Sequence, residues 1–454
     1  MQLLVRRISV TVIENINSFI NGIVWGPFML FVLLGTGIFY TIKLHFFQIR
    51  KFPLWWKMTV GSVIKKEKSV GSGKGISSFQ AMTAALAGAI GTGNIVGVAG
   101  AVALGGAGAI FWMWVAAFFG MATIYAENIL GMKFRIRTDS GFAGGPMYYI
   151  ERGLGFRRLA VVFAVLCALA SLGMGNITQS NSASAALREC FGINTAASGA
   201  VMAAAAGIII SGGIGRIARL TEKLIPAAGI LYLITAIAVI AFHYRMIPAV
   251  LIRIITEAFD IRCAAGGFMG YGMARAVKYG ISRGVFSNEA GLGSSPIVHS
   301  AAEGESYVKQ GMWGVFQVFI DTIVLCTIMA LCILTSGTDT SSSDGVSISI
   351  KSFESVFGSY GRIIIALSIV IFAFATLISW CYYGEKSIEY LFGAKFVPLY
   401  RIIYTAAVLC GSILNIRLVW DISDTLNGLM AIPNLIALIF LNRHIDYKEI
   451  ENHE

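Results

Sequence analysis

Charged residues are scarce in this sequence. Lys, Arg, Asp and Glu make up 13% of its 454 residues, about half of the ~25% that is usual in soluble globular proteins. Hydrophobic residues make up 56%, and the mean hydropathy is +0.75. This balance excludes a soluble globular protein and predicts an integral membrane protein surrounded by a lipid bilayer. The net charge of +11 resides mostly in a few short loops, which indicates membrane topology and no nucleic-acid partner.

Cysteine and histidine are also few, and their spacing indicates no metal site. The seven cysteines form no CxxC pair, and the five histidines fall near segment ends, in loops or in the tail. We therefore predict no cofactor and interpret the cysteines as small apolar core residues. Ser295 and His299 come closest to a nucleophile and its base, but they lie near the predicted cytoplasmic end of a helix. That position disfavours an intramembrane enzyme.

Long apolar runs are abundant. A membrane-spanning helix needs about 20 predominantly apolar residues, and we interpret eleven segments as spans. The first of them is too long for a signal-peptide core and lacks a small-residue cleavage site, so we expect it to remain as a membrane helix. The eleven segments cover approximately residues 19–42, 79–104, 108–133, 159–187, 196–213, 219–242, 265–300, 311–335, 361–390, 396–416 and 420–441.

Basic residues in the short loops predict the orientation. The loop of residues 43–78 contains eight Lys and Arg residues, whereas the N-terminal flank contains only Arg6 and Arg7. Cytoplasmic loops of membrane proteins carry an excess of Lys and Arg. We therefore expect a multi-pass protein of the cell (plasma) membrane, the inner membrane of a bacterium, with its N-terminus outside and the 43–78 loop inside.

Alternation from that start places the remaining loops. The loop of residues 134–158 and the C-terminal tail fall in the cytoplasm, and the loop of residues 336–360 falls outside. The loop of residues 243–262 also falls outside although it contains three arginines. An amphipathic surface helix over residues 246–259 would explain this exception.

Glycine is concentrated in one apolar segment where a helix should be regular. The stretch GAIGTGNIVGVAGAVALGG, residues 88–106, also places Thr92 and Asn94 between glycines. Gly costs roughly 1 kcal/mol against Ala inside a helix. Packing of small residues between helices explains the glycines in part but does not explain the two polar residues. We therefore predict that the helix is interrupted here.

A second interruption is predicted at GVFSNEAGLGSSP, residues 284–296, which places Glu289 and Pro296 inside a required span. A carboxylate at membrane depth costs about 2.5–3.5 kcal/mol on insertion scales. Five segments run from the first interrupted span to residue 242, and five run from the second to residue 441. The two halves start from opposite sides of the membrane, so they form an inverted repeat.

The predicted fold class is therefore an all-α polytopic membrane protein of about eleven transmembrane helices. One extra N-terminal helix precedes a core of five plus five helices, and each half begins with a discontinuous helix. Such paired discontinuous helices indicate the midplane binding site of a transporter. The predicted divisions are 1–78 for the N-terminal helix and basic loop, 79–243 for the first repeat, 244–441 for the second and 442–454 for the tail.

Further polar residues at membrane depth support this interpretation. Asn176, Gln179 and Asn181 share the segment 159–187, and Thr376, Ser379 and Trp380 share the segment 361–390. Asn176 and Asn181 could equally be hydrogen-bond links between helices. For Glu127 and Asp321 we favour structural pairing, with Arg275 or Lys278 as candidate partners.

Several stretches resemble the alanine or glycine:cation symporter family, the sodium:alanine symporters. The resemblance covers nearly the whole chain in order. It rests on GTGNIVGVAGAVALGGAGAIFWMW (91–114), GGPMYYIERGLG (144–155), GNITQSNS (175–182), RGVFSNEAGLGSSPIVHSAA (283–302) and TLISWCYYGE (376–385).

The resemblance implies a leucine-transporter-like core and uptake of alanine or glycine, including D-alanine, with Na⁺ as the coupling ion. Alternating access would carry the substrate across. The unwound main chain of Thr92, Gly93 and Asn94 would hold the substrate carboxylate, and Gln179 would contact the substrate. The remaining implied ligands are Phe286, Ser287, Asn288 and Glu289 for the ammonium, Thr376 and Trp380 for the side-chain pocket, and Ala87, Ile90, Thr376 and Ser379 for Na⁺.

Other functions stay open at this point. A related transporter could carry serine or another small neutral amino acid, and it could be driven by H⁺ because a desolvated Glu289 could titrate. A channel is disfavoured because the sequence contains no filter motif such as TVGYG.

Overall fold

The structure is a computed structural model that describes residues 14–64, 76–138, 141–260, 271–303, 306–341 and 344–453. Arg6, Arg7 and the start of the seventh predicted span, at residue 265, lie outside these ranges. The described residues are almost entirely helical, and the one sheet among them is a short hairpin. In this hairpin β1 (Ile136–Thr138) pairs antiparallel with β2 (Gly141–Ala143).

The helices match the predicted spans. Among the described residues, seven helices are long and apolar enough to cross a membrane, or eight if the bent pair Glu14–Val24 and Pro27–Lys43 counts as one span. The other three predicted spans are the 16-residue helix Thr195–Ile210 and the two interrupted segments. The all-helical fold class is therefore confirmed.

The N-terminal part and the first predicted repeat begin with a bent helix and end with the long helix α13. Helix α6 starts at a capping box, in which the Ser77 hydroxyl accepts from the Gln80 N–H and the Gln80 side chain accepts from the Ser77 N–H. The elements are α2 (Pro27–Lys43), α3 (Phe47–Arg50), α4 (Phe52–Trp56), η1 (Lys57–Gly61), α5 (Ser62–Ile64), α6 (Ser78–Ala89), η2 (Thr92–Asn94), α7 (Val96–Gly105), α8 (Gly108–Lys133), α9 (Pro146–Leu154), α10 (Arg157–Leu172), η3 (Gly173–Ile177), α11 (Thr178–Phe191), α12 (Thr195–Ile210) and α13 (Gly213–Phe242).

The second predicted repeat contains α20, the longest helix among the described residues. It also contains the π-helical segment η5 and the five-residue helix α16. The elements are η4 (Tyr244–Met246), α14 (Ile247–Ala258), α15 (Tyr271–Asn288), α16 (Ser295–His299), α17 (Tyr307–Val318), η5 (Phe319–Cys326), α18 (Thr327–Thr335), α19 (Gly345–Phe357), α20 (Ser359–Phe392), η6 (Ala394–Phe396), α21 (Val397–Ile413), α22 (Ile416–Phe440), η7 (Asn442–His444) and α23 (Lys448–Glu451).

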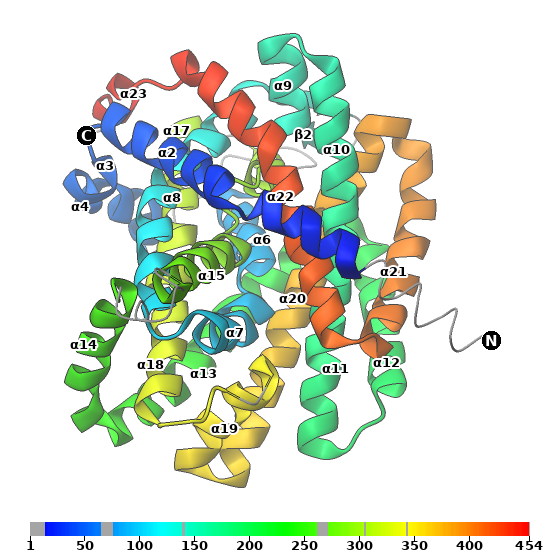
Figure 1. Ribbon diagram of the computed structural model, residues 1–454. Coiled ribbons are helices and arrows are strands. Elements are labelled where there is room, and N and C mark those ends of the chain that lie inside the picture. Colours follow the sequence, from blue (N-terminus) through cyan, green and yellow to red (C-terminus); the bar gives the residue numbers. More distant parts are fainter. Residues whose placement is uncertain are drawn as a thin grey trace.

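The interrupted helices lie at the centre of the molecule. Figure 1 shows α6, α7 and α15 surrounded by the long helices, with α9 and α23 at one end and α14 and α19 at the other. Helix α15 packs on α8 and α7, and α10 and α11 pack on α20. The Lys133 ammonium donates to Glu449 at 2.5 Å, which ties the end of α8 to the C-terminal tail.

Two predicted loops contain helices, and this corrects the sequence interpretation. The loop of residues 134–158 contains the hairpin and α9, and the loop of residues 336–360 contains α19. The Asp344 carboxylate caps α19 by accepting from the N–H groups of Val346 and Ser347. Short helices of this kind lack a long apolar run, so a search for membrane spans passes over them.

The predicted amphipathic helix near residues 246–259 is confirmed as α14. Its buried residues Val250, Ile254 and Ala258 recur every four positions and face the protein. Gly108, at the start of α8, makes this contact possible, because a Cβ there would lie 2.5 Å from main-chain atoms of residues 257 and 258.

We predict that Gly108→Ala weakens the packing of α14 on α8. Overpacking of this kind costs about 1–3 kcal/mol, so the variant should melt several degrees below the parent protein in detergent. Gly229→Ala in α13 is the matched control, since no atom lies within 4 Å of its added methyl group. Equal melting temperatures for the two variants would contradict the tight contact.

Candidate functional site

The first predicted interruption is present. Helix α6 ends at Ala89 and α7 begins at Val96, with the short 3₁₀ turn η2 between them. Ile90 has ψ of 88°, and Gly91 is fully extended, so neither residue continues the helix. All residues of this break are buried. The main-chain groups that the break releases must therefore find partners inside the protein.

Thr376 of α20 satisfies two of the released carbonyls. Its hydroxyl donates to the carbonyl oxygen of Ala87 at 2.8 Å and to that of Ile90 at 3.2 Å. Ser379 follows three residues later on the same helix, and its buried hydroxyl has no hydrogen-bond partner among the described residues. The structure thus brings together three of the four residues that the resemblance assigns to Na⁺, with the fourth on the neighbouring turn.

Two side chains hold the N–H groups of the first break. The Gly91 N–H donates to the Asn94 side-chain oxygen at 3.0 Å, and the Thr92 N–H donates to the Gln179 side-chain oxygen at 3.1 Å. A Cβ on Gly91 would lie 2.4 Å from the Thr376 hydroxyl and 3.0 Å from the Gln179 oxygen. Glycine at position 91 is therefore required for this close approach.

The second predicted interruption is also present. Helix α15 ends at Asn288 and α16 begins at Ser295. Glu289, Gly291 and Gly293 have φ of 64°, 90° and 81°, in the left-handed region that non-glycine residues rarely adopt. The Glu289 carboxylate accepts from the Ser294 hydroxyl at 2.6 Å, which spans the break.

The two breaks are in contact with each other. A Cβ on Gly93 would lie 3.3 Å from the Phe286 ring and 3.4 Å from the Ser287 Cα atom. Trp380 of α20 bridges both breaks, because its Nε1–H lies 3.2 Å from the Gly88 carbonyl oxygen and 2.8 Å from the Glu289 carboxylate. The predicted substrate residues of η2, α11, α15 and α20, together with Glu289 after α15, therefore form one buried cluster.

Asp321 and Glu127 belong to this centre, but the favoured pairing with Arg275 or Lys278 is wrong. Asp321 accepts from the Asn94 amide at 2.7 Å and from the Thr322 hydroxyl at 2.8 Å. The Glu127 carboxylate accepts from the Gly293 N–H at 3.1 Å. Both carboxylates therefore accept hydrogen bonds from uncharged groups that lie in the two breaks or next to them, and from no cationic side chain among the described residues.

Two residues of the centre escaped the sequence analysis. Tyr383 stacks edge-on against Trp380, and a methyl group on Gly88 would come 2.7 Å from its hydroxyl. Asn434 of α22 donates to the Gly291 carbonyl at 2.9 Å and also to Glu127. A sequence feature could have indicated each of these residues. Tyr383 lies three residues after Trp380, on the same helix face. Asn434 follows Pro433 inside an apolar helix.

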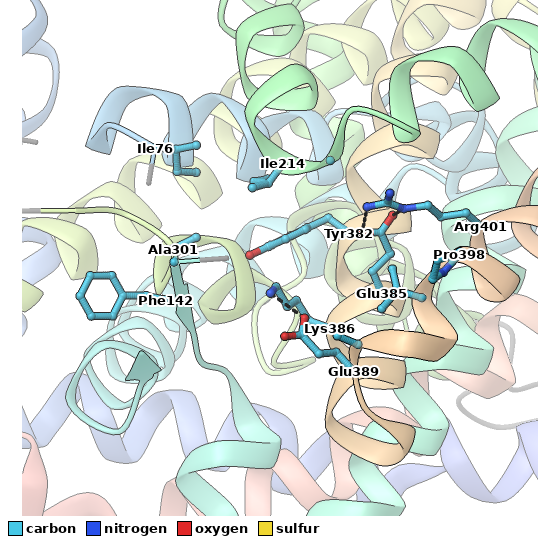
Figure 2. A pocket seen from close by; sticks show the side chains of 14 residues that line it. Ile76, Phe142, Ile214, Ala301, Tyr382, Glu385, Lys386, Glu389, Pro398 and Arg401 are labelled. Carbon is cyan, nitrogen blue, oxygen red and sulfur yellow. Dashed lines mark hydrogen bonds and ion pairs between the residues drawn. The ribbon is translucent and has the colours of Figure 1, made fainter. Parts of the chain in front are cut away.

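Two cavities lie on either side of this centre. One of about 290 Å³ lies beyond Tyr383 along α20 and is lined by Tyr382, Glu385, Lys386 and Arg401 among others. Figure 2 shows the Arg401 guanidinium paired with Glu385 and the Lys386 ammonium paired with Glu389 at its wall. The other, of about 460 Å³, is lined by residues of α7, α15 and α22.

Asp424 and Arg283 line the second cavity and form a buried ion pair. Both contacts between their side chains measure 2.9 Å. The Arg283 guanidinium lies 4.6 Å from the centre of the Trp420 ring, and that ring stacks on Phe286 at 4.9 Å. Trp420 lines this cavity, and its stacking partner Phe286 precedes Glu289 of the second break by three residues.

Residues 10–453 match the model of a protein family described as "Sodium:alanine symporter family". The chain belongs to this family. A sodium/alanine symporter, AgcS of Methanococcus maripaludis, is 43% identical over 95% of this chain and 95% of its own length. A Bacillus subtilis protein described as "Probable sodium/glutamine symporter GlnT" is 38% identical over 95% of this chain and 89% of its own length.

A solved structure shows the fold. The crystal structure of MhsT in complex with L-phenylalanine aligns with a TM-score of 0.57 at 14% identity, over 82% of this chain and 100% of that chain. The fold is thus leucine-transporter-like, as the resemblance implies. The family and its AgcS relative are symporters, so the enzyme alternative is excluded. The protein is a membrane-embedded amino-acid symporter with Na⁺ as its coupling ion.

We predict that Gly91→Ala abolishes transport. The added methyl group would displace Thr376 and Gln179, two of the three side chains that hold the first break. Gly35→Ala in α2 is the matched control because nothing lies within 4 Å of its added methyl group. Amino-acid uptake into proteoliposomes should fall at least tenfold for Gly91→Ala and stay within twofold for Gly35→Ala. Full activity of Gly91→Ala would show that the close approach is dispensable.

Proposed function

We propose that this symporter takes up alanine and glycine together with Na⁺ by alternating access. The observation that carries the proposal is the contact between two buried helix breaks, which brings main-chain groups outside regular helix and a few polar side chains into one small volume. A zwitterion as small as alanine presents little besides its two charged groups. The protein therefore has to recognise it through main-chain N–H and C=O groups and a few polar side chains.

The first break would bind the carboxylate of the substrate. Positive ends of half-helices and free N–H groups favour an anion, and η2 lies at the start of α7. Gln179 now accepts from Thr92 and could turn its amide to the substrate. The proposed substrate ligands are Thr92, Gly93, Asn94 and Gln179 for the carboxylate, and Phe286, Ser287, Asn288 and Glu289 for the ammonium.

The walls of the site favour a small side chain. Trp380 and Phe286 are both fully buried and bulky, and each touches or approaches a glycine of the first break. Thr376 and Trp380 would line the side-chain pocket.

Serine differs from alanine by one hydroxyl group and remains the strongest competing substrate. The similarity to a protein named for glutamine makes larger amides the second competitor.

Na⁺ would bind where α6 unwinds. Hard cations prefer oxygen ligands, and unwound carbonyls serve this purpose in transporters. The Thr376 hydroxyl already lies beside two such carbonyls, and the Ser379 hydroxyl, which has no partner in the described part of the chain, would complete the set. The proposed Na⁺ ligands are Ala87, Ile90, Thr376 and Ser379.

Coupling to Na⁺ supplies the energy for accumulation. One charge moving through 100 mV releases about 2.3 kcal/mol, and a tenfold Na⁺ gradient adds about 1.4 kcal/mol. Together these support a gradient of alanine of roughly 500-fold for one Na⁺.

The two cavities would serve as the outer and inner halves of the route, with the buried breaks between them.

We further propose that the N-terminus lies outside and the C-terminal tail in the cytoplasm. The tail, the end of α8 and the end of α2 lie at one end of the molecule: Lys133 bonds to Glu449, and the Lys43 ammonium bonds to the Asn442 side chain at 2.9 Å. Basic residues near this end favour the cytoplasmic side. Fluorescent-protein and alkaline-phosphatase fusions at the C-terminus would report the side directly.

Uptake of radiolabelled alanine into proteoliposomes tests the function. We expect accumulation with an inward Na⁺ gradient and none when K⁺ replaces Na⁺. Glycine should compete with alanine at equimolar concentration, whereas serine and glutamine should need at least a tenfold excess. Uptake driven by a pH gradient without Na⁺ would show H⁺ coupling, and preferential transport of serine or glutamine would overturn the substrate assignment.

We predict that Thr376→Val raises the Na⁺ concentration for half-maximal uptake at least tenfold. Valine keeps the shape of threonine but removes the hydroxyl, and a tenfold change corresponds to about 1.4 kcal/mol. Thr376→Ser keeps the hydroxyl and is the matched control, with an expected change of under threefold. If both variants matched the parent protein, Thr376 would not be a Na⁺ ligand.

We predict that Trp380→Ala widens the substrate range. Removing the indole ring should let leucine and glutamine inhibit alanine uptake at concentrations at least tenfold lower than in the parent protein. Trp56→Ala, at a partly exposed residue of α4, should leave the inhibition profile unchanged. Unaltered competition by leucine in Trp380→Ala would show that another residue limits the pocket.

A further inference from the structure

The N-terminal helix, residues 14–43, lies outside the two predicted repeats, and no function has been given to it so far. It is bent at Trp25, between its first part Glu14–Val24 and α2. Trp25 is only 2% exposed. Figure 1 shows this helix, in dark blue, crossing α22 near the middle of the molecule, and the hydrogen bonds between the two helices agree with that view.

Two polar side chains of the N-terminal helix donate hydrogen bonds to one turn of α22. The Trp25 Nε1–H donates to the main-chain carbonyl oxygen of Asp424 at 2.8 Å, and the Asn21 amide donates to the Thr425 hydroxyl at 3.2 Å. A Cβ on Gly428, one turn later, would collide with the N-terminal helix, so the two helices are in close contact here. A helix that only shielded α22 from lipid would need apolar contacts and no hydrogen bonds of this kind.

The same part of α22 is joined to α15 by an ion pair and a ring stack. Asp424 pairs with Arg283, and Trp420, four residues before Asp424, stacks on Phe286. Arg283 and Phe286 both belong to α15, the first half of the second interrupted span. Arg283, Trp420 and Asp424 also line the cavity of about 460 Å³. The ion pair and the stack, the α15–α22 contacts, therefore hold two helices together at the wall of this cavity.

The hydrogen bond from Trp25 can fix α22 in place without disturbing the helix. An indole N–H is a donor only, and it needs an acceptor when it is buried. A main-chain carbonyl oxygen has two lone pairs, so the Asp424 carbonyl can accept from Trp25 as well as from its own helix. The N-terminal helix therefore holds the backbone of Asp424 at the place where its side chain meets Arg283.

We propose that Trp25 is a positioning residue for amino-acid binding, which acts by holding α22 where the α15–α22 contacts form. The inference rests on the proposed function in one respect, because Phe286 is a proposed ligand of the amino acid. Exchange of the amino acid through this cavity requires α15 and α22 to separate, and the N-terminal helix opposes that movement of α22. Trp25 thus sets how tightly the amino acid is held without touching it.

Binding of radiolabelled alanine to the purified full-length protein in saturating Na⁺ tests this role. Trp25→Phe keeps an aromatic ring but removes the N–H donor, and we expect it to raise the Kd at least threefold, as the loss of one hydrogen bond would. Trp55→Phe is the matched control, because Trp55 is 1% exposed and its indole donates to the Gln48 carbonyl oxygen at 3.1 Å, away from α22. The control should stay within 1.5-fold of the parent protein. Equal Kd values for Trp25→Phe and the parent protein would overturn the inference.

Thiol labelling gives a second measurement that does not depend on the substrate. Gly97 is buried and lines the same cavity, and a Cβ there would lie 3.6 Å from the Trp420 ring. Gly97→Cys should therefore react with a water-soluble maleimide when Trp420 moves away, with the parent protein and its own cysteines as the blank. Adding Trp25→Phe should raise the labelling rate at least threefold, and adding Trp55→Phe should leave it unchanged. An unchanged rate with Trp25→Phe would contradict the inference, whereas a parent protein that does not bind alanine would refute the proposed function alone.

A double variant shows whether Trp25 acts through the ion pair. Arg283→Lys keeps the positive charge but loses the two parallel hydrogen bonds of the guanidinium to Asp424. In that background Trp25→Phe should raise the Kd less than twofold, and the same threefold rise in both backgrounds would show that Trp25 acts elsewhere. If Trp25→Phe does not fold, Asn21→Leu removes the neighbouring hydrogen bond to α22 and should raise the Kd at least twofold. An unchanged Kd in Asn21→Leu would then overturn the inference.

Discussion

The centre of this protein depends on hydrogen bonds to main-chain groups that two helix breaks release away from water. Thr376 donates to the Ala87 and Ile90 carbonyls, Gln179 accepts from the Thr92 N–H, and Glu127 accepts from the Gly293 N–H. Each of these side chains comes from a different helix. The breaks are therefore held open by the helices that surround them, and not by the flexibility of glycine alone.

Hydrogen bonds of this kind are suited to exchange with a ligand. A neutral hydrogen bond contributes a net of only about 0.5–1.5 kcal/mol. In the proposed binding mode, turning the Thr376 hydrogen away to admit a cation, or exchanging the Gln179 oxygen for a substrate carboxylate, would therefore cost little. The same groups would then satisfy the main chain in the empty protein and bind solutes in the loaded one. A site built from ion pairs would resist such exchange, because removing one partner of a buried pair is strongly destabilising.

Both helix breaks could be predicted from the sequence because glycine and polar residues interrupt an otherwise apolar run there. The partners of the breaks could be predicted only in part. Thr376 and Gln179 stood out as polar residues at membrane depth, but Asn434 meets Glu127 across 307 positions of the chain. A periodic pattern along the sequence does not indicate which polar residues, far apart in the chain, will come into contact. The helices α9 and α19 were missed for a different reason, since each is short and lies in a segment without a long apolar run.

The buried carboxylates differ in whether a cationic side chain balances their charge. Asp424 has a bidentate partner in Arg283, packed against an aromatic stack at the edge of a cavity. Glu289, Asp321 and Glu127 have only neutral donors among the described residues. The ammonium of a zwitterionic amino acid could offset the charge of one ionised carboxylate but not of all three, because the molecule carries no net charge. A cation that enters with it would offset more of the cost, which gives a physical reason why this centre suits symport better than passage of the amino acid alone.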